Sequence, residues 1–264
     1  MTLRDPKPIK KLGQNWLVDT SVIQKMVKAT EIRPTDLIVE IGPGTGAITR
    51  VLAKEADEIV AYEIDQDLVA NLKEELHWAK NVTIVEQNIL AKEFLLPSRN
   101  YKVIGSLPYY ITSPILEKLL TATPLASIIV LMVQMEVAEK ICSLPPDGSY
   151  LSNFVHLFGE PEIVAQVGPT AFFPQPKVES AIMRIKTTPK LDIPHFEIEQ
   201  LQQLLHAGFS EPRKKLHNSL SSGLGTGLVQ TKTLISLANI DSERRPETLS
   251  LPEWVKLYQV IKNA

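Results

Sequence analysis

The chain has 264 residues, 44% of them hydrophobic and 22% charged, with a net charge of −2 at neutral pH. This composition is typical of a folded globular protein and excludes a wholly basic nucleic-acid-binding domain. The longest apolar run, Leu125 to Val133, is far shorter than the roughly 20 residues that a membrane helix needs, so we expect a core strand there and no membrane partner. The N-terminal stretch MTLRDPKPIKK lacks the apolar segment of a secretory signal, and the single cysteine, Cys142, cannot form an internal disulfide. We therefore expect a cytoplasmic protein.

Short apolar, β-branched runs recur from residue 36 onward, and helix-like segments such as 67–76 and 113–121 separate most of them. The expected strands are Asp36–Ile41, Glu58–Glu63, Val82–Glu86, Tyr101–Gly105 and Ala126–Gln134. Strands that alternate with helices predict an α/β fold with a mostly parallel sheet that is covered on both faces. Two later runs, Glu162–Val167 and Ser180–Thr187, are joined by a proline-rich segment without a helix. We expect them to form an antiparallel pair that closes one edge of the sheet.

The pattern changes after Thr188, where TPKLDIP is typical of a linker and the remaining sequence has helical periodicity. The expected helices are Phe196–Gly208, Arg213–Leu220, Val229–Ala238 and Pro252–Lys262. Three glycines, Gly223, Gly225 and Gly227, predict a flexible connection between two of these helices. The sequence thus predicts two domains, residues 1–188 with the sheet and residues 189–264 as a small all-helical domain.

A glycine-rich turn follows the first expected strand, in VEIGPGTGAITRVL. Gly42, Gly44 and Gly46 between a strand and a helix permit a tight turn and a close approach of the backbone to a ligand. Glu63 lies 21 positions after Gly42, at the end of the next strand, where a carboxylate can accept hydrogen bonds from two ribose hydroxyls. This order predicts a nucleoside-type cofactor. It fits NAD and S-adenosylmethionine equally well.

The fourth expected strand ends in GSLPYY, on the same rim of a parallel sheet as the glycine turn. The Ser106 hydroxyl and the Leu107 carbonyl can accept hydrogen bonds from an exocyclic amino group. Pro108 stiffens the turn, and Tyr109 offers a stacking face. Such acceptors favour a more tetrahedral nitrogen, and the ring stabilises the positive charge that develops as a methyl group leaves a sulfonium. These features favour S-adenosylmethionine and predict methyl transfer to an amino-bearing base without a metal.

With these motifs the chain resembles the ribosomal RNA adenine dimethyltransferase family, class I methyltransferases that modify two adjacent adenines near the 3′ end of small-subunit (16S) rRNA. The resemblance rests on KKLGQNWLVD, EIGPGTG, AYEID, SLPYYIT, MVQMEVAEKI, AFFPQPKVESAIMRI, AGFSEPRKKLHNSL and RPETLSLPEWVKLYQVI. It implies a Rossmann-like methyltransferase domain, a small helical RNA-binding domain and S-adenosylmethionine as cofactor. It also implies a monomeric enzyme that dimethylates two adenosines in the RNA of an immature small ribosomal subunit.

The resemblance also assigns roles to individual residues. The implied cofactor contacts are Asn15, Leu17, Gly42, Gly44, Glu63, Asn88 and Ser106. Tyr109 and Phe172 are the candidates to sandwich an adenine flipped out of its stack, and the catalytic group also includes Ser106, Leu107 and Pro108. The implied contacts to RNA phosphates are Lys10, Lys11, Arg213, Lys214 and Lys215.

Three positions depart from the pattern of the resembled family. Ser106 stands where Asn is usual, Asn88 where an Asp usually contacts the cofactor adenine, and Trp16 where Phe is common. The first two lie in the expected site and bear on catalytic efficiency more than on the fold. The alternatives are a weakly active RNA-binding assembly or transcription factor of the same fold, a large-subunit rRNA adenine methyltransferase, and an NAD-dependent oxidoreductase, in which SLPYY would have no explanation.

Overall fold

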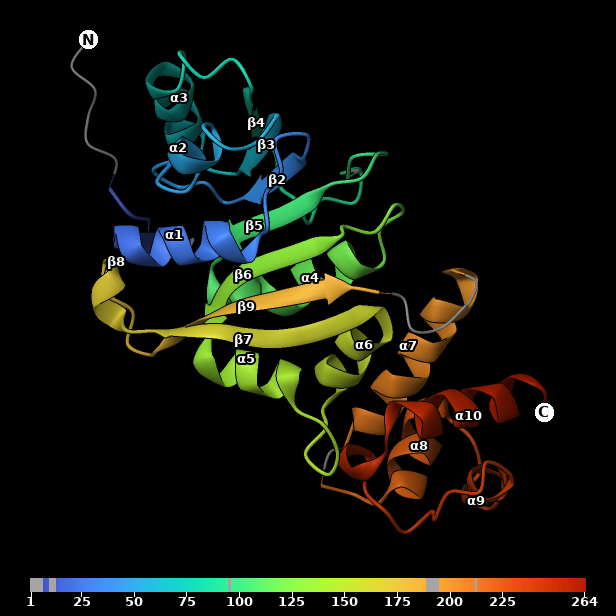
Figure 1. The fold of residues 1–264 in the computed structure, drawn as a ribbon. Coiled ribbons are helices and arrows are strands. Elements are labelled where there is room, and N and C mark those ends of the chain that lie inside the picture. Colours follow the sequence, from blue (N-terminus) through green and yellow to red (C-terminus); the bar gives the residue numbers. More distant parts are fainter. Residues whose placement is uncertain (1–6, 10–12, 95, 189–194, 212) are drawn as a thin grey trace. The chain divides into compact units, whose positions relative to one another are not determined.

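The structure is a computed structural model of the chain and describes all residues except 1–6, 10–12, 95, 189–194 and 212 (Figure 1). The chain groups into two compact units. The first consists of Met1–Ala138 and Pro161–Thr187, and the second of Glu139–Glu160 and Thr188–Ala264. The second unit thus contains the segment 139–160, which the sequence pattern places with the sheet.

A seven-stranded sheet forms the centre of the first unit, in the order β4-β3-β2-β5-β6-β9-β7 (Figure 1). Its strands are β2 (Leu37–Ile41), β3 (Glu58–Glu63), β4 (Val82–Glu86), β5 (Lys102–Ser106), β6 (Ile128–Gln134), β7 (Gly159–Val167) and β9 (Ser180–Thr187). The five strands from β2 to β6 run parallel, whereas β9 is antiparallel to β6. The predicted parallel sheet with an antiparallel edge is therefore confirmed, and the apolar run at 125–133 does contribute a core strand.

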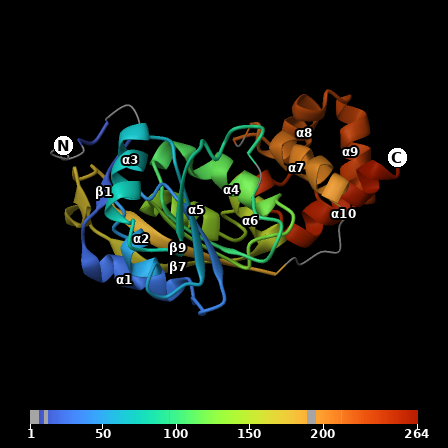
Figure 2. The same ribbon diagram turned by 90° about the horizontal axis from the view of Figure 1, so that it is seen from above.

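Helices cover the sheet on both faces, which explains why β2 is buried along its whole length. Figure 2 shows α1 (Thr20–Ala29) and α2 (Thr49–Leu52) on one side of the strands and α4 (Thr112–Leu120) on the other. The remaining helices of this part of the chain are α3 (Gln66–Glu75) and α5 (Met135–Cys142). No helix among the described residues is long and apolar enough to cross a membrane.

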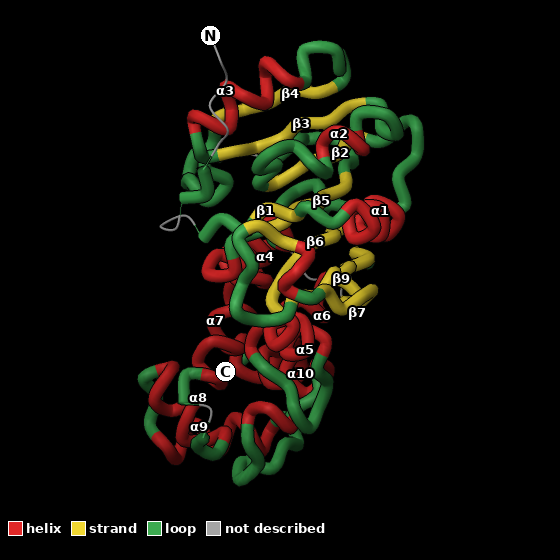
Figure 3. Tube along the Cα trace, turned by 90° about the vertical axis from the view of Figure 1, so that its left-hand side faces the viewer, coloured by secondary structure: helices red, strands yellow, loops and turns green. Residues whose placement is uncertain are grey.

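A second sheet joins two segments that lie far apart in the sequence, β1 (Trp16–Leu17, labelled in Figure 3) and β8 (Phe172–Phe173, labelled in Figure 1). The pair is antiparallel, with Trp16 opposite Phe173 and Leu17 opposite Phe172. The Val18 N–H extends the pairing by donating to the Ala171 carbonyl at 2.9 Å. This short ribbon fixes the N-terminal segment against the AFFPQP stretch at residues 171–176.

The second unit is helical, as predicted for the C-terminal part of the chain. Its helices are α6 (Tyr150–Phe158), α7 (His195–Phe209), α8 (Leu216–Leu224), α9 (Leu228–Leu237) and α10 (Leu251–Lys262). Trp254 is fully buried, and the ring of Tyr150 stacks on His206 with centroids 3.8 Å apart. Two expectations are wrong in detail. The helix expected from Arg213 begins only at Leu216, and Gly223 lies inside α8 instead of in a flexible connection.

Candidate active site

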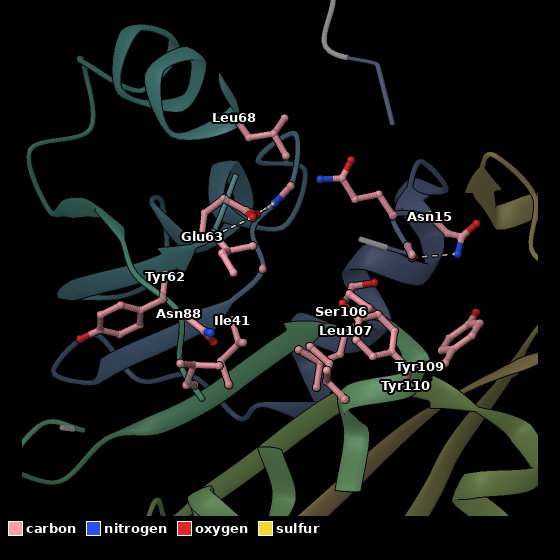
Figure 4. A pocket seen from close by; sticks show the side chains of 18 of the residues that line it. Asn15, Ile41, Tyr62, Glu63, Leu68, Asn88, Ser106, Leu107, Tyr109 and Tyr110 are labelled. Carbon is pink, nitrogen blue, oxygen red and sulfur yellow. Dashed lines mark hydrogen bonds between the residues drawn. The ribbon is translucent and has the colours of Figure 1, made fainter. Parts of the chain in front are cut away.

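The carboxyl ends of four parallel strands, β2 to β5, border a cavity of about 310 Å³ (Figure 4). The stretch from Gly13 to Trp16 and the side chain of Phe172 complete its lining. In the view of Figure 4, Glu63, Leu68 and Asn88 lie on one side of the cavity, and Ser106 and Tyr109 lie on the other. One space therefore contacts both of the motifs that the sequence analysis singled out.

Most of the predicted site residues meet in this cavity. Those that line it are Asn15, Gly42, Gly44, Glu63, Asn88, Ser106, Leu107, Pro108, Tyr109 and Phe172. Leu17 is not among the lining residues, because its side chain points from β1 into the core, where it is 4% exposed. Lys10 and Lys11 lie outside the described residues. Arg213, Lys214 and Lys215 are exposed residues of the second unit.

The glycine turn is held in place by a carboxylate and by an indole ring. Gly44 has a φ of +59°, which favours glycine, and a Cβ there would lie 3.2 Å from Cδ1 of Trp16. Its N–H donates to Oε2 of Glu63 at 3.1 Å. The helix expected directly after the glycines begins only at Thr49 and has four residues. The turn itself, and not a long helix, therefore presents its backbone to the cavity.

Glu63 ends β3 and is 6% exposed. Besides the Gly44 bond, its Oε1 accepts from the N–H groups of Ile64 at 2.8 Å and Asp65 at 3.1 Å. Burial raises the pKa of Glu63, and these backbone donors oppose the rise. Among the described residues that line the cavity, Glu63 alone carries a carboxylate. Oε1 thus uses both of its lone pairs, whereas Oε2, which accepts only from Gly44, retains one that can accept from a ribose hydroxyl.

Two polar residues that the sequence analysis missed fix the N-terminal segment above Glu63. Asp65 caps α3 by accepting from the Asp67 N–H at 3.1 Å, and its other oxygen accepts from Nε2 of Gln14 at 2.9 Å. Gln14 precedes Asn15, so this bond places Asn15 at the cavity. An Asp just before a helix is a recognisable cap. Its second bond, to a residue 51 positions earlier, leaves no signal in the sequence.

Close contact between two strands brings the second motif beside the glycine turn. A Cβ on Gly105 would lie 2.7 Å from the Ile41 carbonyl oxygen, so only glycine allows β5 to lie this close to β2. Ser106 ends β5, and Pro108 leads into a short 3-10 helix over Tyr109–Ile111. Tyr110, which was not predicted, also lines the cavity and is 66% exposed.

The wall formed by the segments after β3 and β4 combines an amide with apolar side chains. Oδ1 of Asn88 accepts from the Leu90 N–H at 2.9 Å, which holds the amide at the cavity. Ile64, Leu68 and Ile89 add apolar surface that suits the faces of a flat ring. The rule that ligands bind at the carboxyl ends of parallel strands points to both segments, although of these four residues only Asn88 was predicted.

The residues that line the cavity fit a nucleoside better than a dinucleotide. A buried carboxylate suits a ribose, and the apolar wall suits an adenine. No lining residue in the described part of the chain is positively charged, and the four-residue helix α2 after the turn offers little dipole for a diphosphate. The site therefore fits S-adenosylmethionine, whose sulfonium is positively charged, better than NAD.

Comparison with known proteins leads to the same class of enzyme. The family model described as "Ribosomal RNA adenine dimethylase" matches residues 7–262. A protein named "Ribosomal RNA small subunit methyltransferase A" from Bacillus pumilus (strain SAFR-032) is 38% identical over 271 residues, which cover 97% of this chain and 91% of the relative. Its namesake from Pelotomaculum thermopropionicum is 38% identical over 265 residues, or 95% of this chain and 90% of the relative.

Solved structures agree with these sequence relatives. The crystal structure of the 23S rRNA methyltransferase ErmE is similar with a TM-score of 0.72 and 27% identity, covering 94% of this chain and 100% of that one. A dimethyladenosine transferase from Plasmodium falciparum has the same fold, with a TM-score of 0.80, 24% identity, and coverage of 94% of this chain and 97% of that one. The oxidoreductase alternative is thereby overturned. The chain belongs to the ribosomal RNA adenine dimethylase family.

Proposed function

We propose that this chain transfers methyl groups from S-adenosylmethionine to the exocyclic amino groups of two adjacent adenosines near the 3′ end of small-subunit rRNA. The observation that carries this proposal is that the SLPYY end of β5 borders the same cavity as Glu63 and the glycine turn. The relatives named for the small subunit support the choice of RNA. The proposed substrate is an immature small subunit in the cytoplasm, and the proposed enzyme is a monomer that needs no metal.

The residues on the β3 and β4 side of the cavity are assigned to the cofactor. Oε2 of Glu63 accepts from a ribose hydroxyl, and Asn88 accepts from the adenine amino group through the free lone pair of its oxygen. The glycine turn, which contacts Glu63 through Gly44, and Asn15 complete this part of the site. When bound, the cofactor supplies a methyl group on a positively charged sulfur.

The residues at the end of β5 are assigned to the target adenine. The Ser106 hydroxyl and the Leu107 carbonyl accept from the amino group, and the rings of Tyr109 and Phe172 face the base. Phe172 is 3% exposed, so it presents only a small part of its ring to the cavity. The amino group loses one proton for each methyl that it gains. Because Glu63 is engaged by three backbone N–H groups, this proton leaves to water.

The test is incubation of the purified chain with methyl-labelled S-adenosylmethionine and small subunits that lack the modification, followed by nucleoside analysis. We expect dimethyladenosine at two adjacent positions, and no label with Tyr109→Ala. Large subunits are tested in parallel, because the similarity to ErmE makes large-subunit RNA the second candidate substrate. Label in the large subunit alone would show that the substrate is large-subunit RNA and not the proposed small-subunit RNA. Tight binding to small subunits without methyl transfer would support the assembly-factor alternative.

A further inference from the structure

The hydroxyl of Tyr109 is held by a residue that does not line the cavity. Its Oη lies 2.6 Å from Oγ of Ser180, within hydrogen-bonding distance, and either oxygen can be the donor. The ring of Tyr109 borders the cavity, whereas Ser180 is fully buried and absent from the lining. The two residues are 71 positions apart, so the tertiary fold creates this contact.

The backbone around Ser180 is fixed by strand pairing. Ser180 begins β9 opposite Gln134, at the end of β6, and the preceding carbonyl, of Glu179, accepts from the Met135 N–H at 3.0 Å. The same strand β6 pairs with β5 at Ser106, opposite Met132. Strand β6 therefore pairs both with the strand that carries Ser180 and with the strand that carries the proposed acceptor Ser106. Their relative position does not depend on a loop.

We propose that Ser180 is a positioning residue: its hydroxyl fixes the tilt of the Tyr109 ring so that the ring faces the target base before the base arrives. This inference rests on the proposed function, because it takes Tyr109 to be the stacking face. A tyrosine ring without this bond is free to pivot about its side-chain torsions. Part of the stabilisation of the charged transition state is then lost each time the ring turns away. Burial raises the pKa of Tyr109, so the hydroxyl stays neutral and keeps its hydrogen bond across neutral pH.

The kinetic test is a double-mutant cycle with Ser180→Ala and Tyr109→Phe. Each variant breaks the same hydrogen bond and leaves the ring in place, so each should lower kcat for methyl transfer about two- to tenfold. The double variant should be no slower than the slower single variant. Calorimetric affinity for S-adenosylmethionine should equal that of the parent. Additive losses, or parent turnover in Ser180→Ala, would overturn the inference.

A matched control separates positioning from a general loss of stability. Thr30 is fully buried in the first unit, and its hydroxyl donates to the Met26 carbonyl at 2.9 Å, away from the cavity. Thr30→Val should lower the melting temperature and leave kcat unchanged. If Thr30→Val slows turnover as much as Ser180→Ala does, the kinetic loss reflects destabilisation and the inference fails.

A spectroscopic readout reports on the ring without the reaction. The chain has six tyrosines, so labelling their ζ carbons with carbon-13 gives few resonances, and Tyr109→Phe identifies the one from Tyr109. Ser180→Ala should shift that resonance, and Thr30→Val should not. An unshifted resonance overturns the inference. A parent chain that methylates no RNA would overturn the proposed function, and the resonance would still show whether Ser180 holds the ring.

Discussion

Two buried carboxyl groups flank the glycine turn, and only Glu63 faces the cavity. Glu40 is 1% exposed, and neither of its oxygens has a hydrogen-bond partner among the described residues. Burial raises its pKa to about 8; Thr49 lies close enough to oppose the rise, although it falls short of hydrogen-bonding geometry. Glu40 is therefore mainly protonated at neutral pH. The three backbone N–H groups that donate to Glu63 favour its charged form, and Glu40 has no such donors in the described part of the chain.

We expect Glu63→Gln to weaken S-adenosylmethionine binding about ten- to a hundredfold. The amide loses the charge and puts an NH₂ group against the backbone donors that the carboxylate now satisfies; lost hydrogen bonds to a charged group cost about 1.5–3 kcal/mol. Glu86→Gln is the matched control, since Glu86 lies opposite Glu63 in the strand register but not in the cavity lining. Calorimetry that gives both variants the parent affinity would remove Glu63 from the site.

Glu40 predicts a pH dependence of stability. Its folded pKa of about 8 lies above the ordinary value of 4.5, so the folded state binds the proton more tightly than the unfolded state does. The stability that this proton provides is complete below about pH 4.5 and falls by up to about 1.4 kcal/mol per pH unit as the pH rises to about 8. Glu40→Gln should remove this decline in urea unfolding measured from pH 5 to 8. Parallel pH profiles for the two chains would contradict it.

Ser106 is the residue whose substitution bears most directly on the proposed chemistry. If its hydroxyl accepts from the amino group in the transition state, Ser106→Ala should lower kcat more than it raises KM. The effect should be moderate, because the Leu107 carbonyl and the Tyr109 ring remain. Ser106→Asn restores the residue usual in the family and should match or exceed the parent. Full activity with Ala and none with Asn would show that the hydroxyl is not an acceptor.

At the scale of elements, the sequence predicts those whose ends are marked by local chemistry. β3 and β4 have the predicted bounds, because polar residues follow directly on short apolar runs. The prediction of a loop at Gly223 is wrong, since a glycine is needed there for close packing of α8 on α7 and not for a turn: a Cβ would lie 2.6 Å from the Cα of Ala207. In the candidate site, too, local features could be predicted and long-range contacts could not. The strand ends that line it could be predicted, whereas the Gln14–Asp65 and Tyr109–Ser180 bonds could not, because each joins residues more than fifty positions apart.

The segment before α8 carries the basic residues expected to bind RNA, and part of its charge is already paired. Lys214 pairs with Glu211, and Lys215 pairs with Glu243 at 2.5 Å. Replacing Arg213, Lys214 and Lys215 by Ala should reduce the slope of log affinity against log salt by roughly 0.7–0.9 for each RNA phosphate that the variant no longer neutralises. Cofactor affinity should not change. An unaltered salt slope in subunit-binding measurements would make the cluster an ordinary solvated surface.

A substitution at Glu243 tests the same basic residues in the opposite direction, because it removes negative charge instead of positive charge. Lysines 215 and 232 both pair with it, and these bonds lower the pKa of Glu243 to about 2. Glu243→Gln removes the negative charge and leaves both lysines available to phosphate. Subunit affinity should therefore rise, and the salt slope should steepen. If affinity falls instead, Glu243 serves to orient the lysines and does not compete with RNA for them.

At the scale of the whole molecule, the chain enters the helical unit twice. Residues 139–160 belong to that unit, although 27 residues of the first unit, Pro161–Thr187, follow them before the chain returns. Tyr150 of α6 accepts a hydrogen bond from Nε2 of Gln202 at 2.9 Å and stacks on His206, and both partners come from α7. The expected boundary between residues 188 and 189 would therefore separate α6 from its partners.

We expect a chain that ends at residue 188 to be less stable than the parent, although it keeps every residue that lines the cavity. The reason is that Tyr150 loses both the stacking and the hydrogen bond that α7 supplies. Thermal unfolding should begin at a lower temperature, and a dye that binds exposed apolar surface should fluoresce more strongly. Parent-like unfolding and parent affinity for S-adenosylmethionine would show that residues 1–188 form an independent domain.

Because two separate segments of the chain form the helical unit, its helices are synthesised at different times. The apolar side chains of α6, among them Phe154 and Leu157, are synthesised before any residue of α7 to α10 exists. About a hundred residues separate the ends of α6 and α10, and at roughly 5–20 residues per second their translation takes on the order of 5–20 seconds. In the first half of that interval, until α7 is complete about fifty residues after α6, the nascent chain lacks the partners that α7 supplies to α6. A chaperone that binds exposed apolar helices would therefore find its target on the growing chain, and not on the finished protein.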